Sequence, residues 1–374
     1  MAKPNNETDI AIIGGGVIGT ALAHTLSASY AVLLFEKNYS LGDEQSGRSS
    51  GVNHAGIYYK PHSLASRLCV EGNALLSSFC EQHAVPYRPV GKLIIPTSSG
   101  QEGILEQLCG NAHASGATAV SLISSSKIQE IEPHVSATLA LYSPTSGIVD
   151  TASLVHCLAA LAENQGVLIL RQTTVTRITP IFDSLFSGFS IETKERGSCN
   201  ARIVINAAGL YAPDIASMVH SENSFHLAPL RGEYCSYIPT RDTLKINGNI
   251  YPVPDKLSVG IHLTPTFDNG KILVGPYFHS IPPEDRARYD LPRQSPAFFA
   301  AAVHNFFPQL RAEDLSLDYC GTMARLAPKS DFIIERDTHY SNCIHLLGIG
   351  SPGVTASLAI AQYVKRILNN SSNC

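Results

Sequence analysis

A glycine-rich turn between two apolar segments constrains the fold of this chain more than any other feature. Asp9-Ile-Ala-Ile-Ile13 is followed by Gly14-Gly-Gly16-Val-Ile-Gly19, by an apolar stretch and by Val32-Leu-Leu-Phe-Glu36. This order predicts a strand, a tight turn, a helix and a second strand that ends in an acid. Such a unit binds a dinucleotide, although the motif alone does not separate FAD from NAD.

Each part of this motif has a physical reason. Gly14 permits the tight turn, Gly16 has no side chain to hold a diphosphate away from the backbone, and Gly19 lets the helix approach the strand closely. The free amides at the helix N-terminus stabilise phosphate charge. Glu36 is placed to accept hydrogen bonds from both hydroxyls of an unphosphorylated ribose. The alternative is a glycine-rich loop that only packs a helix on a sheet.

Length and composition indicate two domains that act on small molecules. A chain of 374 residues exceeds the size at which one hydrophobic core stops growing. The formal net charge is −4 and no long basic run is present, so the electrostatic footprint of nucleic-acid binding is absent. Residues 154–162 form one of the longest apolar runs, and they are too few to span a bilayer.

Cysteine usage and the N-terminal composition bear on location. The nine cysteines are widely spaced without a CxxC pair, which argues against a structural zinc site and a disulfide framework. We therefore expect core thiols and no bound metal. Residues 1–8 are polar and lack the apolar core of a signal peptide. We expect a soluble protein of the cytoplasm, with peripheral attachment to the inner membrane left open.

The rest of the chain has patterns typical of both helices and strands. Apolar residues at helical spacing predict helices at residues 63–83, 104–114, 124–131, 151–165 and 354–368. Strand patterns occupy residues 85–97, 166–170, 173–179, 190–194, 202–209 and, broken by proline and glycine, 229–275. Small residues end the strand at 206–209, which lets a ligand approach the sheet. A second glycine-rich turn at 346–353 opens the last helix, and its amides suit an anionic or electron-rich ligand edge.

With these segments the chain resembles the FAD-dependent D-amino-acid-oxidase superfamily, and within it the L-2-hydroxyglutarate dehydrogenase branch. The similar stretches cover nearly the whole chain: 14–19 with Glu36, 49–60, 91–93, 146–150, 206–209, 229–234, 250–255, 260–264 and 348–356. The block at 51–60, Arg231-Gly-Glu-Tyr234 and Tyr251-Pro-Val-Pro-Asp255 are more specific than the glycine motif.

The resemblance implies an α/β fold with a discontinuous Rossmann-like FAD-binding domain and a substrate domain with a mostly antiparallel sheet. The FAD-binding domain is expected at residues 1–84, 145–225 and 315–374. The substrate domain is expected at residues 85–144 and 226–314.

The cofactor is expected to be FAD, bound without a covalent link. By resemblance, the residues that hold it are Gly14, Gly16, Val17, Ile18, Gly19, Glu36, Lys37, Ser49, Ser50, Gly51, Val52, His54, Val175, Ala207, Ala208, Gly209, Gly350, Ser351, Pro352, Gly353, Val354 and Thr355. Small residues at these positions also have a simpler interpretation, which is tight packing. Cys320 lies near the position at which sarcosine oxidases carry a cysteine bonded to the flavin, but a buried apolar role is the default for cysteine.

Two histidines are candidates for the base that removes the hydroxyl proton of a 2-hydroxy acid. His262 lies in Val259-Gly-Ile-His-Leu-Thr264, on a strand that the resemblance places over the flavin. The alternative for His262 is a buried histidine bonded to a carbonyl group. His54 is the second candidate, in a His-Ala-Gly turn that the resemblance places beside the flavin, where it is equally suited to brace that loop.

Arg231, Lys60, Tyr251 and Arg325 are the candidates for binding substrate carboxylate or hydroxyl groups. An arginine makes two parallel charge-assisted bonds to a carboxylate, and Lys60 is equally suited to the surface. The chain departs from the family pattern at Met323, where relatives of this branch usually carry an arginine. If residues 323 and 325 share a strand, Arg325 points to the same face and is a candidate to replace that arginine. The alternative is an ordinary surface arginine.

The expected activity is oxidation of an L-2-hydroxy acid, L-2-hydroxyglutarate first, to the 2-oxo acid by hydride transfer to flavin N5. The first alternative is an oxidase of an amino acid or a secondary amine of the sarcosine or glycine type. The second is a flavoprotein without catalytic activity. The sequence leaves open whether the electron acceptor is a quinone, oxygen or a redox partner, and it does not indicate the oligomeric state.

Overall fold

The computed structural model describes residues 7–182, 186–223, 225–254, 259–328 and 331–370. These residues divide into two compact units. The first unit comprises Met1–Gly47, Thr151–Pro229 and Met323–Cys374, and the second comprises Arg48–Asp150 and Leu230–Thr322. Both units are therefore built from segments that are separate in the sequence, as the resemblance implies.

The first unit is organised around a mixed sheet in the order β10-β11-β12-β1-β2-β9, with β21 also beside β12 and β20 beside β21. β12, β1, β2, β9 and β21 run parallel, whereas β10, β11 and β20 pair with antiparallel neighbours. The central strands are continuous apolar runs because both faces of a parallel sheet are covered. The bounds are β1 (Glu7–Ile13), β2 (Val32–Phe35), β9 (Leu168–Leu170), β10 (Val175–Phe182), β11 (Ser187–Thr193), β12 (Gly197–Asn206), β20 (Ile333–Arg336) and β21 (Cys343–Leu347).

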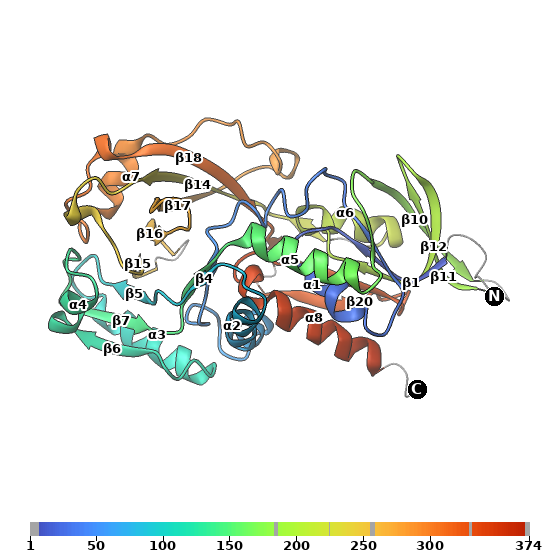
Figure 1. The fold of residues 1–374 in the computed structure, drawn as a ribbon, viewed down its shortest axis with the longest axis horizontal. Coiled ribbons are helices and arrows are strands. Elements are labelled where there is room, and N and C mark those ends of the chain that lie inside the picture. The colour runs from blue at the N-terminus through green and yellow to red at the C-terminus, as the bar shows by residue number, and fades with distance from the viewer. Residues whose placement is uncertain (1–6, 183–185, 224, 255–258, 329–330, 371–374) are drawn as a thin grey trace. The chain divides into compact units, whose positions relative to one another are not determined.

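Helices pack closely on this sheet because small residues line their contacts. α1 (Val17–Leu26) packs against α5 (Thr151–Asn164) and α8 (Gly353–Asn369), as Figure 1 shows. α1 buries Ala21 and Ala23, and α8 buries Ala356, Ala359 and Ala361. The short helices η1 (Gly209–Tyr211) and α6 (Ala212–Val219) follow β12. β13 (His226–Leu227) pairs with β19 (Leu326–Ala327).

The second unit is organised around an eight-stranded sheet in the order β18-β14-β17-β16-β15-β5-β7-β6. The described pairings are antiparallel except for β15 with β5, so the expectation of a mostly antiparallel sheet is confirmed. The bounds are β5 (Lys92–Ile95), β6 (Ser121–Ser124), β7 (Leu139–Ser143), β14 (Leu230–Tyr237), β15 (Asn249–Pro252), β16 (His262–Pro265), β17 (Ile272–Ser280) and β18 (Ser316–Met323).

Helices and a small sheet complete the second unit. The helices are α2 (Leu64–Gln82), α3 (Glu102–Ala114), α4 (Ser125–Ile131), α7 (Pro296–Val303) and the short η2 (Asp242–Leu244), η3 (Pro283–Asp285) and η4 (Ala312–Asp314). β3 (Val52–Asn53), β8 (Gly147–Val149) and β4 (Tyr87–Arg88) form the small sheet. One core cluster combines Phe299, Phe306 and Phe307 with apolar residues of the large sheet such as Leu263.

The division of the chain differs from the expected boundaries in four segments. Residues 145–150 and 315–322 were expected with the FAD-binding segments but lie in the second unit, and residues 226–229 were expected in the substrate domain but lie in the first. Residues 48–84 were expected with the FAD-binding segments, whereas they lie in the second unit. The reason is strand pairing: Val52 and Asn53 pair with β8, and β8 pairs with β4. The predicted helix at 63–83 is present as α2, and the Ser63 hydroxyl accepts a hydrogen bond from the Ser66 amide at its N-terminus.

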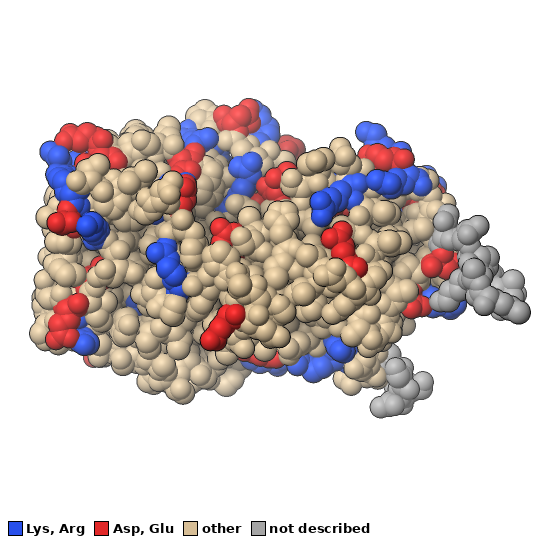
Figure 2. Space-filling model, in the orientation of Figure 1, with Lys and Arg blue, Asp and Glu red and all other residues tan. Residues whose placement is uncertain are grey.

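The charge distribution on the surface and the state of the cysteines can be compared with what the composition predicts, namely no basic cluster and core thiols. On the face shown in Figure 2, basic and acidic side chains are interspersed over the described residues rather than gathered by sign. The eight described cysteines are free thiols, and five of them are buried. Cys374 lies outside the described residues.

Candidate functional site

The glycine turn is fixed by close contacts between backbone segments. Gly14 has a φ of +111°, and a Cβ at this position would lie 2.5 Å from the carbonyl oxygen of Ala207. A Cβ at Gly19 would lie 1.8 Å from the carbonyl oxygen of Gly14. Neither position tolerates a side chain, so these two glycines are required by the fold before any ligand is considered.

Gly16 differs from the other two glycines of the motif. It is the N-cap of α1 and makes no side-chain cap, and a Cβ there would meet only the Ser46 hydroxyl oxygen, at 3.0 Å. The Val17 amide donates to the same hydroxyl oxygen at 3.0 Å, and the following first-turn amide, that of Ile18, has no intrahelical acceptor. A glycine at this N-cap leaves the helix-terminal amides uncovered by a side chain of its own, which is the arrangement that a diphosphate needs.

Glu36 directly follows β2, next to this turn. Its carboxylate accepts hydrogen bonds from the amides of Gly15 and Asn38, each at 2.8 Å. Burial raises the pKa of Glu36, while the two amides act in the opposite direction. Each carboxylate oxygen retains acceptor capacity for a ribose hydroxyl. Lys37 instead pairs with Glu44, so its side chain is already engaged.

The strand ends beside the turn leave room for a ligand. Ile13 and Asn206 are register partners on the parallel strands β1 and β12, and the Ala207 amide donates to the Ile13 carbonyl at 2.9 Å. Ala208 follows, and a Cβ at Gly209 would meet nothing within 4 Å. Parallel sheets bind ligands at the carboxyl ends of their strands. Val175, expected among the residues that hold FAD, is buried at the start of β10.

The second glycine turn is held from two sides. The Ser351 amide donates to Met323 Sδ at 3.2 Å, and a Cβ at Gly350 would lie 2.4 Å from Met323 Cγ. Gln45 donates to the Ile349 carbonyl at 2.7 Å and accepts from the Ala324 amide at 2.8 Å. Sequence analysis did not identify Gln45, because its partners are distant in the chain. α8 then begins at Gly353 with Val354 and Thr355 in its first turn and with no side-chain cap from Pro352.

The predicted cofactor residues 49–54 belong to the second unit. Gly51 has a φ of +67° and its carbonyl accepts from the Val149 amide at 2.8 Å. The Ser49 carbonyl accepts from the Tyr319 hydroxyl at 3.0 Å, and Val52 is paired in β3. These contacts fix the segment that carries Ser50 and His54. The FAD contacts of this segment stay a prediction.

A cluster of buried polar side chains lies in the second unit, around Lys92. The Lys92 ammonium is 3.2 Å from His54 Nδ1 and 4.0 Å from the ring centroid of Tyr251. The Tyr251 ring stacks on the His262 ring at a centroid distance of 3.6 Å. Lys92, Tyr251 and His262 are each no more than 2% exposed. The adjacent strands β5, β15 and β16 carry Lys92, Tyr251 and His262. His54 directly follows β3, so three predicted site residues lie together around a lysine.

Lys92 is not among the predicted site residues. The signal in the sequence is Lys92-Leu-Ile-Ile95, which places a lysine at the start of an otherwise apolar strand. Burial lowers the pKa of Lys92 to about 7. The neighbouring Cys69 thiol is not an anion at neutral pH, because burial raises its pKa to about 12. Among the described residues no carboxylate pairs with Lys92, which leaves a buried cation able to receive an anion.

His262 has one engaged and one open ring nitrogen. Nδ1 lies 2.9 Å from the carbonyl oxygen of Gly260, which assigns the proton to Nδ1. Nε2 is buried and has no hydrogen-bond partner among the described residues. Burial and, less strongly, the Lys92 charge lower the pKa of His262 to about 3. The two hypotheses for His262, a histidine bonded to a carbonyl group and a proton acceptor, are therefore compatible, because they use different nitrogens of the ring.

Arg231 is buried on β14. Its guanidinium donates to the Leu291 carbonyl at 2.7 Å and to the Cys320 sulfur at 3.3 Å. Its Nε is buried without a partner among the described residues. Cys320 is itself only 1% exposed, and its sulfur accepts the Arg231 bond.

Lys60 and Arg325 have exposed side chains. The expectation that residues 323 and 325 share a strand is wrong, since β18 ends at Met323 and β19 starts at Leu326. The alternation of side chains therefore does not carry over to Arg325. The Met323 thioether, at the position of the missing arginine, packs on the second glycine turn instead.

Comparison with known proteins identifies the class. The FAD-dependent oxidoreductase (DAO) family matches residues 9–367, so this chain belongs to that family and FAD is its cofactor. L-2-hydroxyglutarate dehydrogenase of Caenorhabditis elegans is 32% identical, over 95% of this chain and 92% of that protein. Glycerol 3-phosphate dehydrogenase of Caloramator mitchellensis is 31% identical, over 97% of this chain and 74% of that protein. The structure of L-α-glycerophosphate oxidase from Mycoplasma pneumoniae with FAD bound has a TM-score of 0.89 and 27% identity, over 97% and 95% of the two chains.

Two further findings concern membrane spans and the location of a relative. Over the described ranges, no helix has both the length and the apolar character needed to cross a membrane. The nematode relative is described as mitochondrial.

The different surroundings of Gly16 and Gly19 yield a prediction. Gly16→Ala is expected to weaken FAD binding and to cost less stability than Gly19→Ala, because its Cβ meets one side-chain hydroxyl oxygen, that of Ser46 at 3.0 Å, rather than backbone. Gly19→Ala is expected to destabilise the FAD-free protein by about 3 kcal/mol or more, because its Cβ overlaps a carbonyl oxygen. Thermal unfolding without FAD and fluorescence titration with FAD measure the two effects. Equal FAD affinity of Gly16→Ala and the parent protein would contradict the assignment.

Proposed function

We propose that this chain oxidises L-2-hydroxyglutarate to the corresponding 2-oxo acid. FAD, when bound, accepts the hydride that leaves the substrate Cα. The observation that carries the proposal is the buried Lys92 ammonium beside His54, Tyr251 and His262, without a carboxylate partner among the described residues. The similarity to L-2-hydroxyglutarate dehydrogenase over most of both chains supports the same substrate.

Lys92 favours an anionic substrate. An unpaired ammonium in a buried position is costly, and an opposite charge that arrives with the ligand offsets that cost. A dicarboxylate supplies two such charges. A neutral amine or alcohol supplies none.

His262 is the proposed proton acceptor. Its open Nε2 is the only ring nitrogen available, because Nδ1 faces the Gly260 carbonyl. A pKa of about 3 makes His262 a weak base in the substrate-free protein. A bound carboxylate raises the pKa of a nearby imidazole, so the anionic substrate strengthens the base that acts on its own hydroxyl group. His54, which contacts Lys92, is the proposed second histidine of the site.

The remaining candidates for binding the substrate are ranked by how well their surroundings suit that role. Arg231 ranks first, since its buried Nε has no partner among the described residues. Tyr251 follows, through its place between Lys92 and His262. Lys60 and Arg325 have exposed side chains and come last. FAD is proposed to be bound without a covalent link, because the Cys320 sulfur is engaged by Arg231.

A phosphorylated alcohol is the second candidate substrate. One relative is described as a glycerol 3-phosphate dehydrogenase and one similar structure as a glycerophosphate oxidase. Such a substrate also joins a secondary hydroxyl group to an anion, which Lys92 suits equally well.

The proposal also includes a location and an electron acceptor. We propose a cytoplasmic location, and an electron acceptor that is a quinone, oxygen or a redox protein.

Anaerobic mixing with a substrate panel tests the activity. L-2-hydroxyglutarate is expected to bleach the flavin absorbance, and D-2-hydroxyglutarate, glycerol 3-phosphate, glycine and sarcosine are expected to leave it oxidised. Bleaching by glycerol 3-phosphate alone would transfer the assignment to the second candidate. Bleaching by the amines alone would indicate an amine oxidase, and oxidised flavin with every compound would indicate a flavoprotein without this activity.

His262→Ala tests the proton acceptor. The rate constant of flavin reduction by L-2-hydroxyglutarate is expected to fall by roughly 10² to 10⁴-fold, as for loss of a general base. The flavin spectrum and the unfolding temperature serve as checks that FAD binding and fold persist. His304→Ala, an exposed histidine of the same unit, is the matched control and should react at the parent rate. A variant at 262 with an unchanged reduction rate would remove this residue from the mechanism.

Lys92→Met tests the anion site through pH. Glutarate lacks the hydroxyl group and is a suitable unreactive probe, whose binding perturbs the flavin spectrum. In the parent protein the ammonium is present below a pKa of about 7 and lost above it, so the glutarate Kd should rise with pH, by up to about tenfold per unit. Lys92→Met should bind glutarate weakly at every pH, whereas the exposed Lys127→Met should match the parent. A parent-like pH profile in Lys92→Met would overturn this role.

A further inference from the structure

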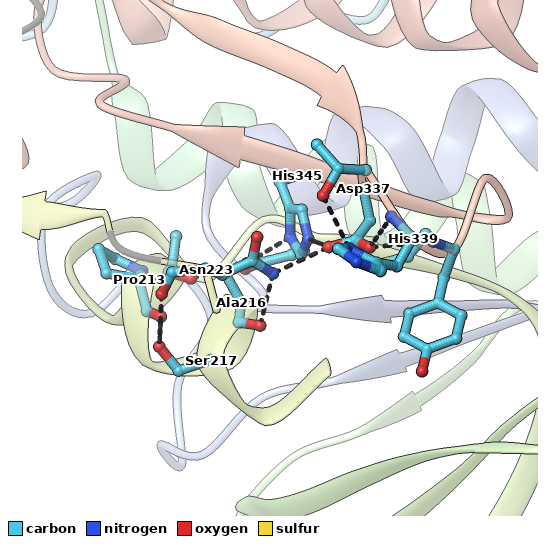
Figure 3. Close-up of polar contacts among 12 residues, drawn as sticks. Pro213, Ala216, Ser217, Asn223, Asp337, His339 and His345 are labelled. Carbon is cyan, nitrogen blue, oxygen red and sulfur yellow. Dashed lines mark hydrogen bonds and ion pairs between the residues drawn. The ribbon is translucent and has the colours of Figure 1, made fainter. Parts of the chain in front are cut away.

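A second polar centre lies in the first unit, at the carboxyl end of α6 and the turn between β20 and β21. Asp337 Oδ2 accepts a hydrogen bond from the Asn223 amide at 2.8 Å and lies 3.1 Å from His345 Nε2 (Figure 3). His345 Nδ1 is 3.2 Å from the Asn206 amide nitrogen. Asp337 and His345 are 5% and 1% exposed. The flavin chemistry described above uses none of these side chains.

This network fixes two chain segments relative to each other. Asp337 Oδ1 accepts from the backbone amides of His339 and Tyr340, both at 2.9 Å, which shapes the turn that carries His339. Asn223 donates both to Asp337 and, at 3.0 Å, to the Ala216 carbonyl near the end of α6. Figure 3 shows Asn223 in this bridging position. The segment after α6 is thereby held against the turn at His339.

The two segments bring His220, Glu222 and His339 together. One ligand atom from each, an imidazole nitrogen or a carboxylate oxygen, lies within 4.8 Å of the other two. The rings of His220 and His339 stack at a centroid distance of 3.7 Å.

A separate observation concerns the ring nitrogens of the two histidines. His220 Nδ1 is buried and has no hydrogen-bond partner among the described residues. His339 Nδ1 lies 3.1 Å from the Thr338 hydroxyl oxygen, which orients the ring and leaves Nε2 for another contact. A second hydrogen bond of this kind commonly positions a histidine that binds a metal.

We propose that His220, Glu222 and His339 bind a divalent transition-metal ion of the zinc type. Two imidazole nitrogens and one carboxylate oxygen are a ligand set that Zn²⁺ accepts, with water in the remaining position. Ni²⁺ and Cu²⁺ accept the same ligands, whereas Mg²⁺ and Ca²⁺ prefer oxygen. The ion would link the end of α6 to the β20–β21 turn. The sequence predicted no bound metal, and that prediction rested on the spacing of the cysteines. His220, Glu222 and His339 form no such short motif, because His339 lies far from the other two in the sequence.

Metal binding is measured on the FAD-loaded protein after removal of metals with a chelator. Equilibrium dialysis against ZnCl₂ with elemental analysis is expected to give about one Zn²⁺ per chain, and Zn²⁺ is expected to raise the unfolding temperature. His339→Ala should lose this equivalent and the thermal shift. Glu222→Gln alters one exposed side chain without loss of volume and should weaken the Kd at least tenfold. His156→Ala, an exposed histidine on α5, should behave as the parent.

Two results would overturn the site. One is equal Zn²⁺ binding by the parent, His339→Ala and Glu222→Gln. The other is loss of the bound equivalent after alkylation of the cysteines, which would locate the ion at thiols. Flavin reduction by L-2-hydroxyglutarate is measured in parallel, so that failure of the proposed activity and failure of metal binding are seen separately.

Discussion

The first unit depends on the close approach of backbone at the glycine turn. The carbonyl oxygen of Gly14 occupies the space that a side chain on Gly19 would need, and the carbonyl of Ala207 does the same for Gly14. These contacts hold β1, α1 and the end of β12 together. The N-terminus of α1 carries no side chain at Gly16, and α8, which packs on α1, brings the second glycine turn into the same unit. The packing of this turn therefore depends on the absence of side chains at Gly14 and Gly19. The proposed cofactor contacts depend on the same turn.

The second unit is organised around a different constraint, the burial of charge. Its sheet places Lys92 among aromatic rings and histidines rather than beside an acid. Desolvation lowers the pKa of both Lys92 and His262, so the site is less charged when empty than its composition suggests. An anionic substrate would reverse both shifts, since opposite charge favours the protonated forms. In the proposed reaction the same electrostatic effect connects substrate choice with proton transfer.

Much of the fold was predictable because its signals are local. The strand, turn and helix at residues 9–36, the helices α2, α3, α4, α5 and α8, and the antiparallel pattern of residues 229–275 follow from hydrophobic spacing and turn residues close together in the chain. The placement of 48–84 was not predictable in this way. Val52 pairs with a strand nearly a hundred residues further on, and no local pattern specifies that partner. The end of β18 at Met323 was missed for the same reason, and with it the surface position of Arg325.

By itself the sequence determined the nucleotide motif, the FAD-dependent family and the chemical types of the site residues, because these depend on residue identity and short spacings. The tertiary structure decided which of those residues are neighbours. It joined Lys92 to His54, Tyr251 and His262, set Met323 against the second glycine turn, and brought His220 and Glu222 to His339. The physical reason is that burial and pKa depend on groups supplied by distant segments. Hydrophobic spacing predicts which face of a helix or strand is buried, but it does not predict which residues that face contacts.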